Sequence, residues 1–227
     1  VPNISEGRDL DKIKRISHEV ETVAGVKLLD VDPGIATNRT VITFVGEPSQ
    51  VIEAAFKLIK LASQLIDMSK HKGEHPRFGA TDVCPLVPIS GITLEETSKY
   101  AQLLGKRVGE ELKIPVYLYE NAARIPDRIN LANCRSGEYE GLLKKLSDPD
   151  WAPDFGPIEY NNHVASTGAT AISARDFLVA YNVNLNTTST RRANAIAFDI
   201  REGGRVKRTG NPIIGQKVLD NDGNPIR

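Results

Sequence analysis

The residue types and spacing that could carry chemistry are concentrated between His71 and His75. The segment His71-Lys-Gly-Glu-His75 matches the H-x-x-E-H pattern of one class of zinc peptidase. That mechanism needs both histidines on one face of a helix, with the glutamate beside a metal-bound water. Gly73 lies inside the motif and Pro76 follows it, and both residues disfavour a helix at His75. The sequence therefore predicts a non-helical loop here and argues against a metal site.

In such a loop His75 could instead act as a general base. An imidazole beside a carboxylate has a pKa near neutrality, which suits proton transfer at physiological pH. Pro76 stiffens the loop, and the glycine within it would let a ligand approach closely. The alternative is a surface histidine with no catalytic role, and this is the simpler interpretation for the other three histidines, His18, His71 and His163.

Several polar side chains elsewhere have two possible roles each. Asp32 ends a predicted strand, where it could hold ligand N–H groups or stabilise the turn, and its residue type favours the turn. Arg39 begins the facing strand and could clamp a carboxylate through two parallel hydrogen bonds. It could equally form a weak surface ion pair. The same two interpretations apply to Arg77, Arg124 and Arg175.

Composition limits the class of protein. The 227 residues include 29 basic and 29 acidic side chains, and zero net charge argues against a nucleic-acid binder. Cys84 and Cys134 are too few for a disulfide framework, and no apolar run approaches the roughly 20 residues that cross a bilayer. The first residues show no signal peptide. We therefore predict a cytoplasmic protein that binds neither nucleic acid nor membrane.

The elements that must position these residues follow from the hydrophobic periodicity. Apolar residues spaced by three or four predict helices, and runs of β-branched residues predict strands. The predicted elements are a strand at 1–4, a helix ending at Gly25, a buried strand at 26–32, a strand at 40–46, a helix from Pro48 to about Met68, a strand at 82–88, a helix from Thr93 to Leu112, a strand at 116–119 and a helix at 138–146.

The order of these elements predicts an α+β fold. Through residue 88 the order is βαββαβ, which is the split, ferredoxin-like arrangement, and an αβ extension follows. Helices would cover one face of a mostly antiparallel sheet, so the other face needs a second layer or a partner.

The remainder of the chain changes character. Residues 147–168 form a predicted long loop, followed by an apolar strand at 177–185 and a helix at 189–202. In that helix Ala193, Ile196, Ala197 and Ile200 are expected to face inward. We therefore predict one subdomain over 1–172, the start of a second α/β subdomain over 173–203, and a flexible linker or tail over 204–227.

Six segments together resemble the glutamate formiminotransferase family. They are Val1–Gly7, Leu29–Asp32, Thr37–Val41, Ile66–Arg77, Asp82–Pro85 and Trp151–Pro157, and the resemblance extends to about residue 203. It implies transfer of a formimidoyl group from N-formimidoyl-L-glutamate to N5 of the co-substrate tetrahydrofolate, in histidine degradation and one-carbon metabolism. It also implies two subdomains stacked sheet on sheet with folate between them, and no metal. We expect a homodimer.

The resemblance also implies which residues form the site. The family's catalytic histidine lies in a Gly-Glu-His-Pro motif, which corresponds to His75. The folate-contacting loop corresponds to Gly156–Gly168, with an apparent insertion around Tyr160–His163. The implied substrate-binding residues are Asp32, Asn38, Arg39, Arg77, Gly156, Pro157, Ser166, Thr167 and Gly168.

For two of these positions we hypothesise specific roles: Asp32 would orient His75 or the pterin, and Arg39, like Arg77, would bind carboxylate. Two alternatives stay open. The chain stops inside what resembles the family's inter-subdomain linker, so it could be a non-catalytic folate-binding module. The donor could also be N-formyl-L-glutamate, since its formyl group has an oxygen where the formimidoyl group has an NH, and the sequence does not distinguish the two.

Overall fold

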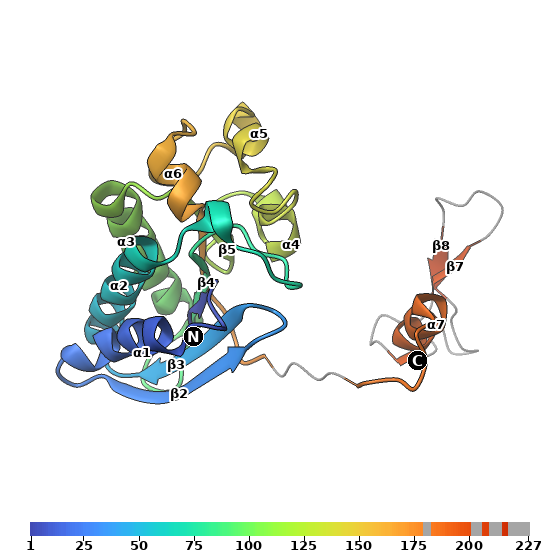
Figure 1. Cartoon of the computed structure of the whole chain (residues 1–227), viewed down its shortest axis with the longest axis horizontal. Coiled ribbons are helices and arrows are strands. Elements are labelled where there is room, and N and C mark those ends of the chain that lie inside the picture. Colours follow the sequence, from blue (N-terminus) through green and yellow to red (C-terminus); the bar gives the residue numbers. More distant parts are fainter. Residues whose placement is uncertain (179–182, 201–205, 209–214, 218–227) are drawn as a thin grey trace. The chain divides into compact units, whose positions relative to one another are not determined.

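The structure, a computed structural model, describes residues 1–178, 183–200, 206–208 and 215–217. It divides into two compact units, Val1–Phe177 and Leu178–Arg227. Figure 1 shows the path of the chain. The main elements of the first unit are β1 (Asn3–Ile4), α1 (Leu10–His18), β2 (Lys27–Gly34), β3 (Arg39–Val45), α2 (Pro48–Leu65), β4 (Thr81–Leu86), α3 (Leu94–Leu112), β5 (Val116–Glu120), α4 (Leu131–Cys134), α5 (Leu142–Leu146), α6 (Asn162–Thr167) and β6 (Thr170–Ala174).

One six-stranded sheet with the order β2-β3-β1-β4-β6-β5 organises the first unit. The pairs β2–β3, β3–β1 and β1–β4 are antiparallel, whereas β6 pairs in parallel with both β4 and β5. The predicted α+β class is confirmed. In the first four strands β3 is inserted between β1 and β2, as a split βαβ unit requires. The ferredoxin-like description remains an interpretation that this strand order supports.

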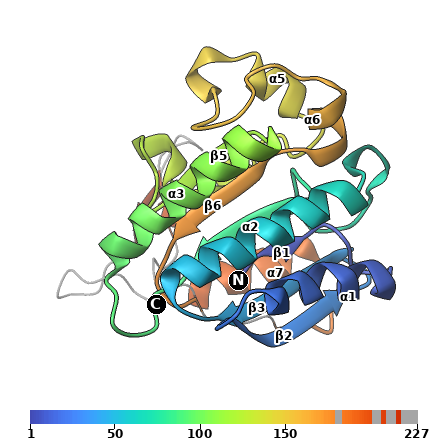
Figure 2. The same cartoon turned by 90° about the vertical axis from the view of Figure 1, so that its left-hand side faces the viewer.

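Three helices cover one face of the sheet. Ile16 of α1, Ile59 of α2 and Leu104 of α3 are fully buried against strand residues such as Ile42 and Cys84. Figure 2 shows these helices side by side in front of the strands. The start of α3 has the capping box that Thr93 and its Glu three residues later predict. This layer is the main hydrophobic core.

The opposite face of the sheet is covered over only half its width. Tyr117 and Val83 of the strands pack there against Cys134, Leu142 and Val164, which come from the connecting segments. In Figure 1, α4 lies on the side of the sheet away from α2 and α3. The segment after β5 therefore supplies part of the cover that the sequence requires.

The half of this face formed by β2 and β3 is open. Along β3 buried and half-buried residues alternate, with Thr40 and Ile42 facing the helices, so Val41 and Thr43 face the other way. Asp32 pairs with Val41 and is exposed. The predicted burial of the strand at 26–32 is therefore wrong, because β2 is the edge of the sheet.

The end of the first unit differs from the prediction. The strand predicted at 177–185 is absent from its described residues, 177–178 and 183–185, while 179–182 lie outside the described residues. The sixth strand is instead β6, which is buried throughout. Periodicity misses it because a strand buried on both faces does not alternate. The predicted boundary at 172 falls inside this strand.

In the second unit the structure describes α7 (Thr190–Ile200) and two short paired strands, β7 (Val206–Arg208) and β8 (Gly215–Lys217). The helix is where the sequence predicts it, but the inward-facing stripe is wrong: Ile196, Ala197 and Ile200 are exposed and Ala193 is half-buried. An apolar stripe becomes buried only where another element covers it. β7 and β8 lie within the predicted tail. Among the described residues, no helix combines the length and apolar character that crossing a membrane requires.

Candidate active site

The loop between α2 and β4 carries the His71–His75 motif. A short 3₁₀ turn over Met68–Lys70 follows α2, and the residues after this turn are non-helical, as predicted. The two histidines are therefore not displayed on one helical face. They face different neighbours and have different hydrogen-bond partners.

His71 is held on both sides by the protein. Its Nε2–H donates to the carbonyl oxygen of Asn38 at 2.9 Å, and its Nδ1 accepts from Nε–H of Arg77 at 3.2 Å. Since a carbonyl can only accept and a guanidinium can only donate, these contacts fix a neutral Nε2–H tautomer. Burial lowers the pKa of His71 from its ordinary value of 6.5. Neither ring nitrogen is available to a metal or a substrate in this arrangement.

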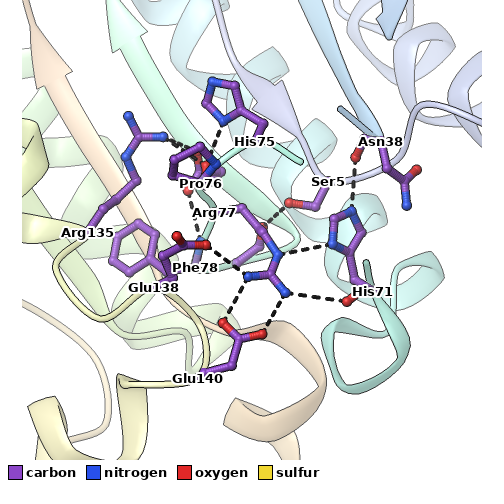
Figure 3. A network of polar contacts seen from close by, with 12 residues as sticks. Ser5, Asn38, His71, His75, Pro76, Arg77, Phe78, Arg135, Glu138 and Glu140 are labelled. Atoms are coloured by element: carbon purple, nitrogen blue, oxygen red, sulfur yellow. Dashed lines mark hydrogen bonds and ion pairs between the residues drawn. The ribbon is translucent and has the colours of Figure 1, made fainter. Parts of the chain in front are cut away.

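Arg77 is the centre of a larger network, shown in Figure 3. Its Nη1 donates to Glu138 at 3.1 Å and to Glu140 at 2.9 Å, and its Nη2 donates to Glu140 at 2.8 Å and to the carbonyl oxygen of His71 at 3.4 Å. With the bond from Nε, all five donors of the guanidinium have protein partners. In the structure Arg77 therefore braces its own loop.

An open hollow of about 560 Å³ lies beside this network, lined by Lys72, Gly73, Gly137 and the two glutamates. Arg77 also lines this hollow, and because all its donors are engaged, a substrate carboxylate could bind it there only by displacing Glu138 or Glu140. The role of Arg77 in carboxylate binding stays a prediction, with that condition attached.

Asn38 connects three segments. Its Oδ1 accepts from the backbone N–H of Gly7 at 2.9 Å, and its Nδ2 donates to the carbonyl oxygen of Lys72 at 3.0 Å. Its φ is 48°, a left-handed conformation that asparagine tolerates better than most residues. Because its side chain is buried and bonded, Asn38 holds the N-terminal segment and the histidine loop against the β2–β3 hairpin.

His75 is arranged differently from His71. Its Nδ1–H donates to the carbonyl oxygen of Pro76 at 2.7 Å, so the neutral ring carries its proton on Nδ1 and its lone pair on Nε2. Nε2 makes no hydrogen bond with any residue in the described part of the chain. Figure 3 shows it pointing away from the polar network. His75 is half-buried, so a ligand can reach the lone pair on Nε2.

Three charged side chains surround His75. Burial lowers the pKa of His75 from its ordinary value of 6.5, and the positive charges of Arg39 and Arg135 lower it further, while the bond to the Pro76 carbonyl and the charge of Asp82 act in the opposite direction. The net lowering keeps the ring neutral near pH 7, which a general base requires.

Asp82 is a further residue of the candidate site, and the sequence analysis missed it. Its carboxylate is fully buried and accepts from Phe78 N–H at 3.0 Å, from Arg135 at 2.9 Å and from Arg39. A bulge where β4 pairs with β1 accompanies this placement. The available signal was a carboxylate inside an apolar strand segment, because a buried charge needs partners. Arg135, from the segment after α4, has no such sequence signal.

Of the predicted ligand residues on the open half of the sheet, Arg39 contacts this cluster. Arg39 donates from Nε to Asn3 at 3.1 Å and from Nη1 to Asp82, so its Nη2 has no hydrogen-bond partner among the described residues. Asp32 is exposed, and its side chain makes no hydrogen bond or ion pair with the residues described. The ring of His75 is oriented by Pro76, so Asp32 is left with the pterin as its predicted partner.

The predicted folate loop divides into two parts with different neighbours. Gly156 packs against α3 and Ile114, with Pro157 following it. Thr167 accepts from Ala80 N–H at 2.8 Å through its carbonyl oxygen, and Gly168, next to Ser166 and Thr167, forms a bridge with Gly79. This second part contacts the segment between His75 and β4, at Gly79 and Ala80. The contacts of the loop with folate stay a prediction.

The zinc-peptidase interpretation has little support from this geometry. Its two histidines are not one helical turn apart, and both nitrogens of His71 are engaged. Within the ranges that the structure describes, no three His, Cys, Asp or Glu side chains are grouped closely enough to hold a metal ion.

Comparison with known families agrees with the motif. The model described as formiminotransferase domain, N-terminal subdomain, matches residues 1–175. The chain belongs to this family. The first unit, with its sheet, its histidine loop and β6, is therefore a formiminotransferase N-terminal subdomain.

Relatives of known name cover most of this chain. It is 52% identical to formimidoyltransferase-cyclodeaminase of Mus musculus over 207 residues. This alignment covers 91% of this chain and 38% of that protein. It is 51% identical to glutamate formimidoyltransferase of Thermoplasma acidophilum, over 88% of this chain and 66% of that protein. It is 46% identical to glutamate formimidoyltransferase of Streptococcus pyogenes, over 90% of this chain and 67% of that protein. The chain thus spans about two fifths of the length of the first of these relatives.

Proposed function

We propose that this formiminotransferase subdomain carries the catalytic base of a glutamate formimidoyltransferase. The reaction would move the formimidoyl group from N-formimidoyl-L-glutamate to N5 of tetrahydrofolate, as a step of histidine degradation that feeds one-carbon metabolism. The observation that carries the proposal is the ring of His75, whose tautomer leaves Nε2 with a lone pair and no protein partner. Membership of the family supplies the reaction class.

His75 would move one proton twice. A C–N bond forms between N5 and the formimidoyl carbon, and the bond from that carbon to the glutamate nitrogen breaks. Nε2 of His75 would take the proton that N5 must lose and return it to the departing glutamate nitrogen, so that charge and protons balance. General catalysis of this kind contributes roughly 10²–10⁴-fold to a rate. The lowered pKa of His75 keeps it in the accepting form.

Other residues would bind the two substrates. The exposed carboxylate of Asp32 suits the N–H groups of a pterin, and Nη2 of Arg39 suits a substrate carboxylate. Asn38 would act by holding the loop. The remaining predicted folate contacts are Gly156, Pro157, Ser166, Thr167 and Gly168. A cytoplasmic location and a homodimer remain predictions of the sequence.

Two alternative functions are separated by measuring turnover with each donor together with tetrahydrofolate binding. N-formyl-L-glutamate as donor would give turnover with the formyl and not the formimidoyl compound. A non-catalytic folate-binding module would bind tetrahydrofolate and turn over neither donor. The intact geometry around His75 favours a transferase, because folate binding alone does not require a base.

The test is substitution of His75 in this chain, with turnover and tetrahydrofolate binding measured side by side. We expect His75→Ala to lower kcat by roughly 10²–10⁴-fold and to leave folate binding largely intact. His18→Ala is the matched control, since His18 is a solvent-exposed histidine on α1. Unchanged turnover in His75→Ala would exclude the proposed base.

A further inference from the structure

The carbonyl oxygen of Pro76 is shared by two donors. It accepts from Nδ1–H of His75 at 2.7 Å and from Nη1 of Arg135 at 3.1 Å. A carbonyl oxygen has two lone pairs, so this pair of bonds saturates it. Figure 3 shows the two side chains approaching Pro76 from different elements.

The orientation of this carbonyl decides the tautomer of His75. The ring of proline fixes φ at Pro76, so the direction of its carbonyl depends on one remaining rotation, about ψ. Arg135 holds that rotation by bonding the oxygen. If the carbonyl turned away, Nδ1 would lose its acceptor, and the proton could move to Nε2, where it would block the base.

Arg135 is itself held by a buried anion. The same Nη1 donates to Oδ2 of Asp82 at 2.9 Å, and Oδ1 of Asp82 accepts from the N–H of Phe78 at 3.0 Å. The loop is thus held at two backbone groups. The carbonyl of Pro76 accepts from Arg135, and two residues later the N–H of Phe78 donates to Asp82. Both attachments lead to Asp82, whose side chain is fully buried.

We propose that Arg135 is a positioning residue for the transfer reaction, holding His75 in its Nδ1–H tautomer through the carbonyl of Pro76, with Asp82 as its anchor. The inference rests on the proposed function for its kinetic consequence but not for its structural one. Arg135 lies 60 residues after His75 in sequence, and no motif in the sequence connects them.

The direct measurement is the tautomer of His75 by ¹⁵N and ¹³C NMR, which needs no substrate. The chain contains only four histidines, so single substitutions assign the signals. We expect the Nδ1–H tautomer in the unsubstituted chain. In Arg135→Met we expect a mixture in which Nε2–H appears, and a fall in kcat of roughly 10- to 100-fold with KM little changed.

Arg135→Lys should recover most of both properties. One nitrogen of Arg135 makes the contacts to Pro76 and Asp82, and the single nitrogen of lysine also has enough N–H groups for both. Arg107→Met is the matched control, because Arg107 pairs with Glu53 and Glu111 on the helical side of the unit. It should change neither the tautomer nor kcat.

Three results would overturn the inference. The first is an Nε2–H tautomer in the unsubstituted chain, which decides the matter even if Arg135→Met does not fold. The second is a folded Arg135→Met with unchanged tautomer and kcat. The third is a loss of kcat with the tautomer unchanged, which would mark a merely structural arginine. If the tautomer shifts as expected but no chain transfers the formimidoyl group, the control of the His75 tautomer by Arg135 holds and the proposed function fails.

Discussion

Arg77 and Glu140 form a two-point ion pair, with Nη1 at 2.9 Å from Oε2 and Nη2 at 2.8 Å from Oε1. The pair is asymmetric: the side chain of Arg77 is 9% exposed, whereas that of Glu140 is 65% exposed. The sequence gives no signal of this role for Arg77. Its side chain bonds both His71 and the segment after β5 that carries Glu138 and Glu140. The loop that presents His75 therefore depends on the arginine more than on its acidic partners.

Substitution of the two partners should have unequal effects on stability. Arg77→Met removes five hydrogen bonds in a buried setting and should lower the free energy of unfolding by about 3 kcal/mol. Glu140→Gln should cost only about 0–1 kcal/mol, because solvent replaces an exposed carboxylate easily. Urea denaturation of both variants measures the difference. Equal losses would show that the pair acts as a surface ion pair and not as a brace.

Gly168 should be intolerant of a side chain. Its φ is +66°, and a Cβ there would lie 2.2 Å from the carbonyl oxygen of Phe78, which is backbone and cannot move aside. We expect Gly168→Ala to lower the free energy of unfolding by about 3 kcal/mol, from the clash together with a backbone conformation, φ 66° and ψ −153°, that essentially only glycine adopts. Gly91→Ala is the control, with φ +70° and open space around its Cβ, and should cost about 1 kcal/mol. Similar losses for both would contradict the close packing at Gly168.

Stability should fall on mild acidification because of His71. Burial lowers its folded-state pKa below 6.5, the value that an unfolded chain would show. Between the two pKa values the unfolded state binds more protons, so the free energy of unfolding decreases as the pH falls from 6.5 toward 5. His75 acts in the same direction.

The carboxylates with lowered pKa values, such as Glu140, lose their contribution at lower pH, below 4.5. From pH 6.5 to 5 the slope reports the histidines together with the buried amino group of Val1, whose pKa burial lowers from 8.0, and Glu120, whose pKa burial raises, so substitution is needed to isolate His71. His71→Gln should flatten the pH dependence of the urea midpoint in this window relative to the unsubstituted chain. An unchanged slope in His71→Gln would show that His71 binds its proton without cost in the fold.

Local patterns predict much of this fold because local physics determines those elements. The stripe of α2, the capping box at Thr93 and the β-branched run of β3 each specify their own element. β6 was missed because its residues, Thr170–Ala174, include small and polar ones. They are buried in the middle of the sheet, where β6 pairs with strands that lie far away in sequence. Where burial depends on distant partners, periodicity carries no signal.

The same division applies to the site. The non-helical conformation at His75 follows from Gly73 and Pro76, which are local. The bonds of Asp82 and Arg135 depend on how β4 meets β1 and on where the segment after α4 folds back, so the sequence does not reveal them. A resemblance to a family implies that His75 is the base, but the tautomer that this proposed role needs comes from the tertiary structure.

The rate of formimidoyl transfer should depend on pH through His75. The proposed mechanism needs the neutral ring, so kcat/KM should rise with pH and level off above the pKa of His75, which burial and the charges of Arg39 and Arg135 place below 6.5. Arg39→Met removes one positive charge and leaves the charge of Asp82 less compensated. Both changes favour the protonated ring, so the acid limb should move to higher pH.

The position of this limb is independent of any loss of substrate affinity. Arg39→Met is expected to raise KM if Arg39 binds a carboxylate, but a uniform loss of affinity lowers the whole profile without shifting it. The pKa of His75 from NMR titration of the same variants should move with the kinetic limb. A limb that lies above pH 6.5, or one that stays fixed while the NMR value moves, would mean that another group supplies the proton acceptor.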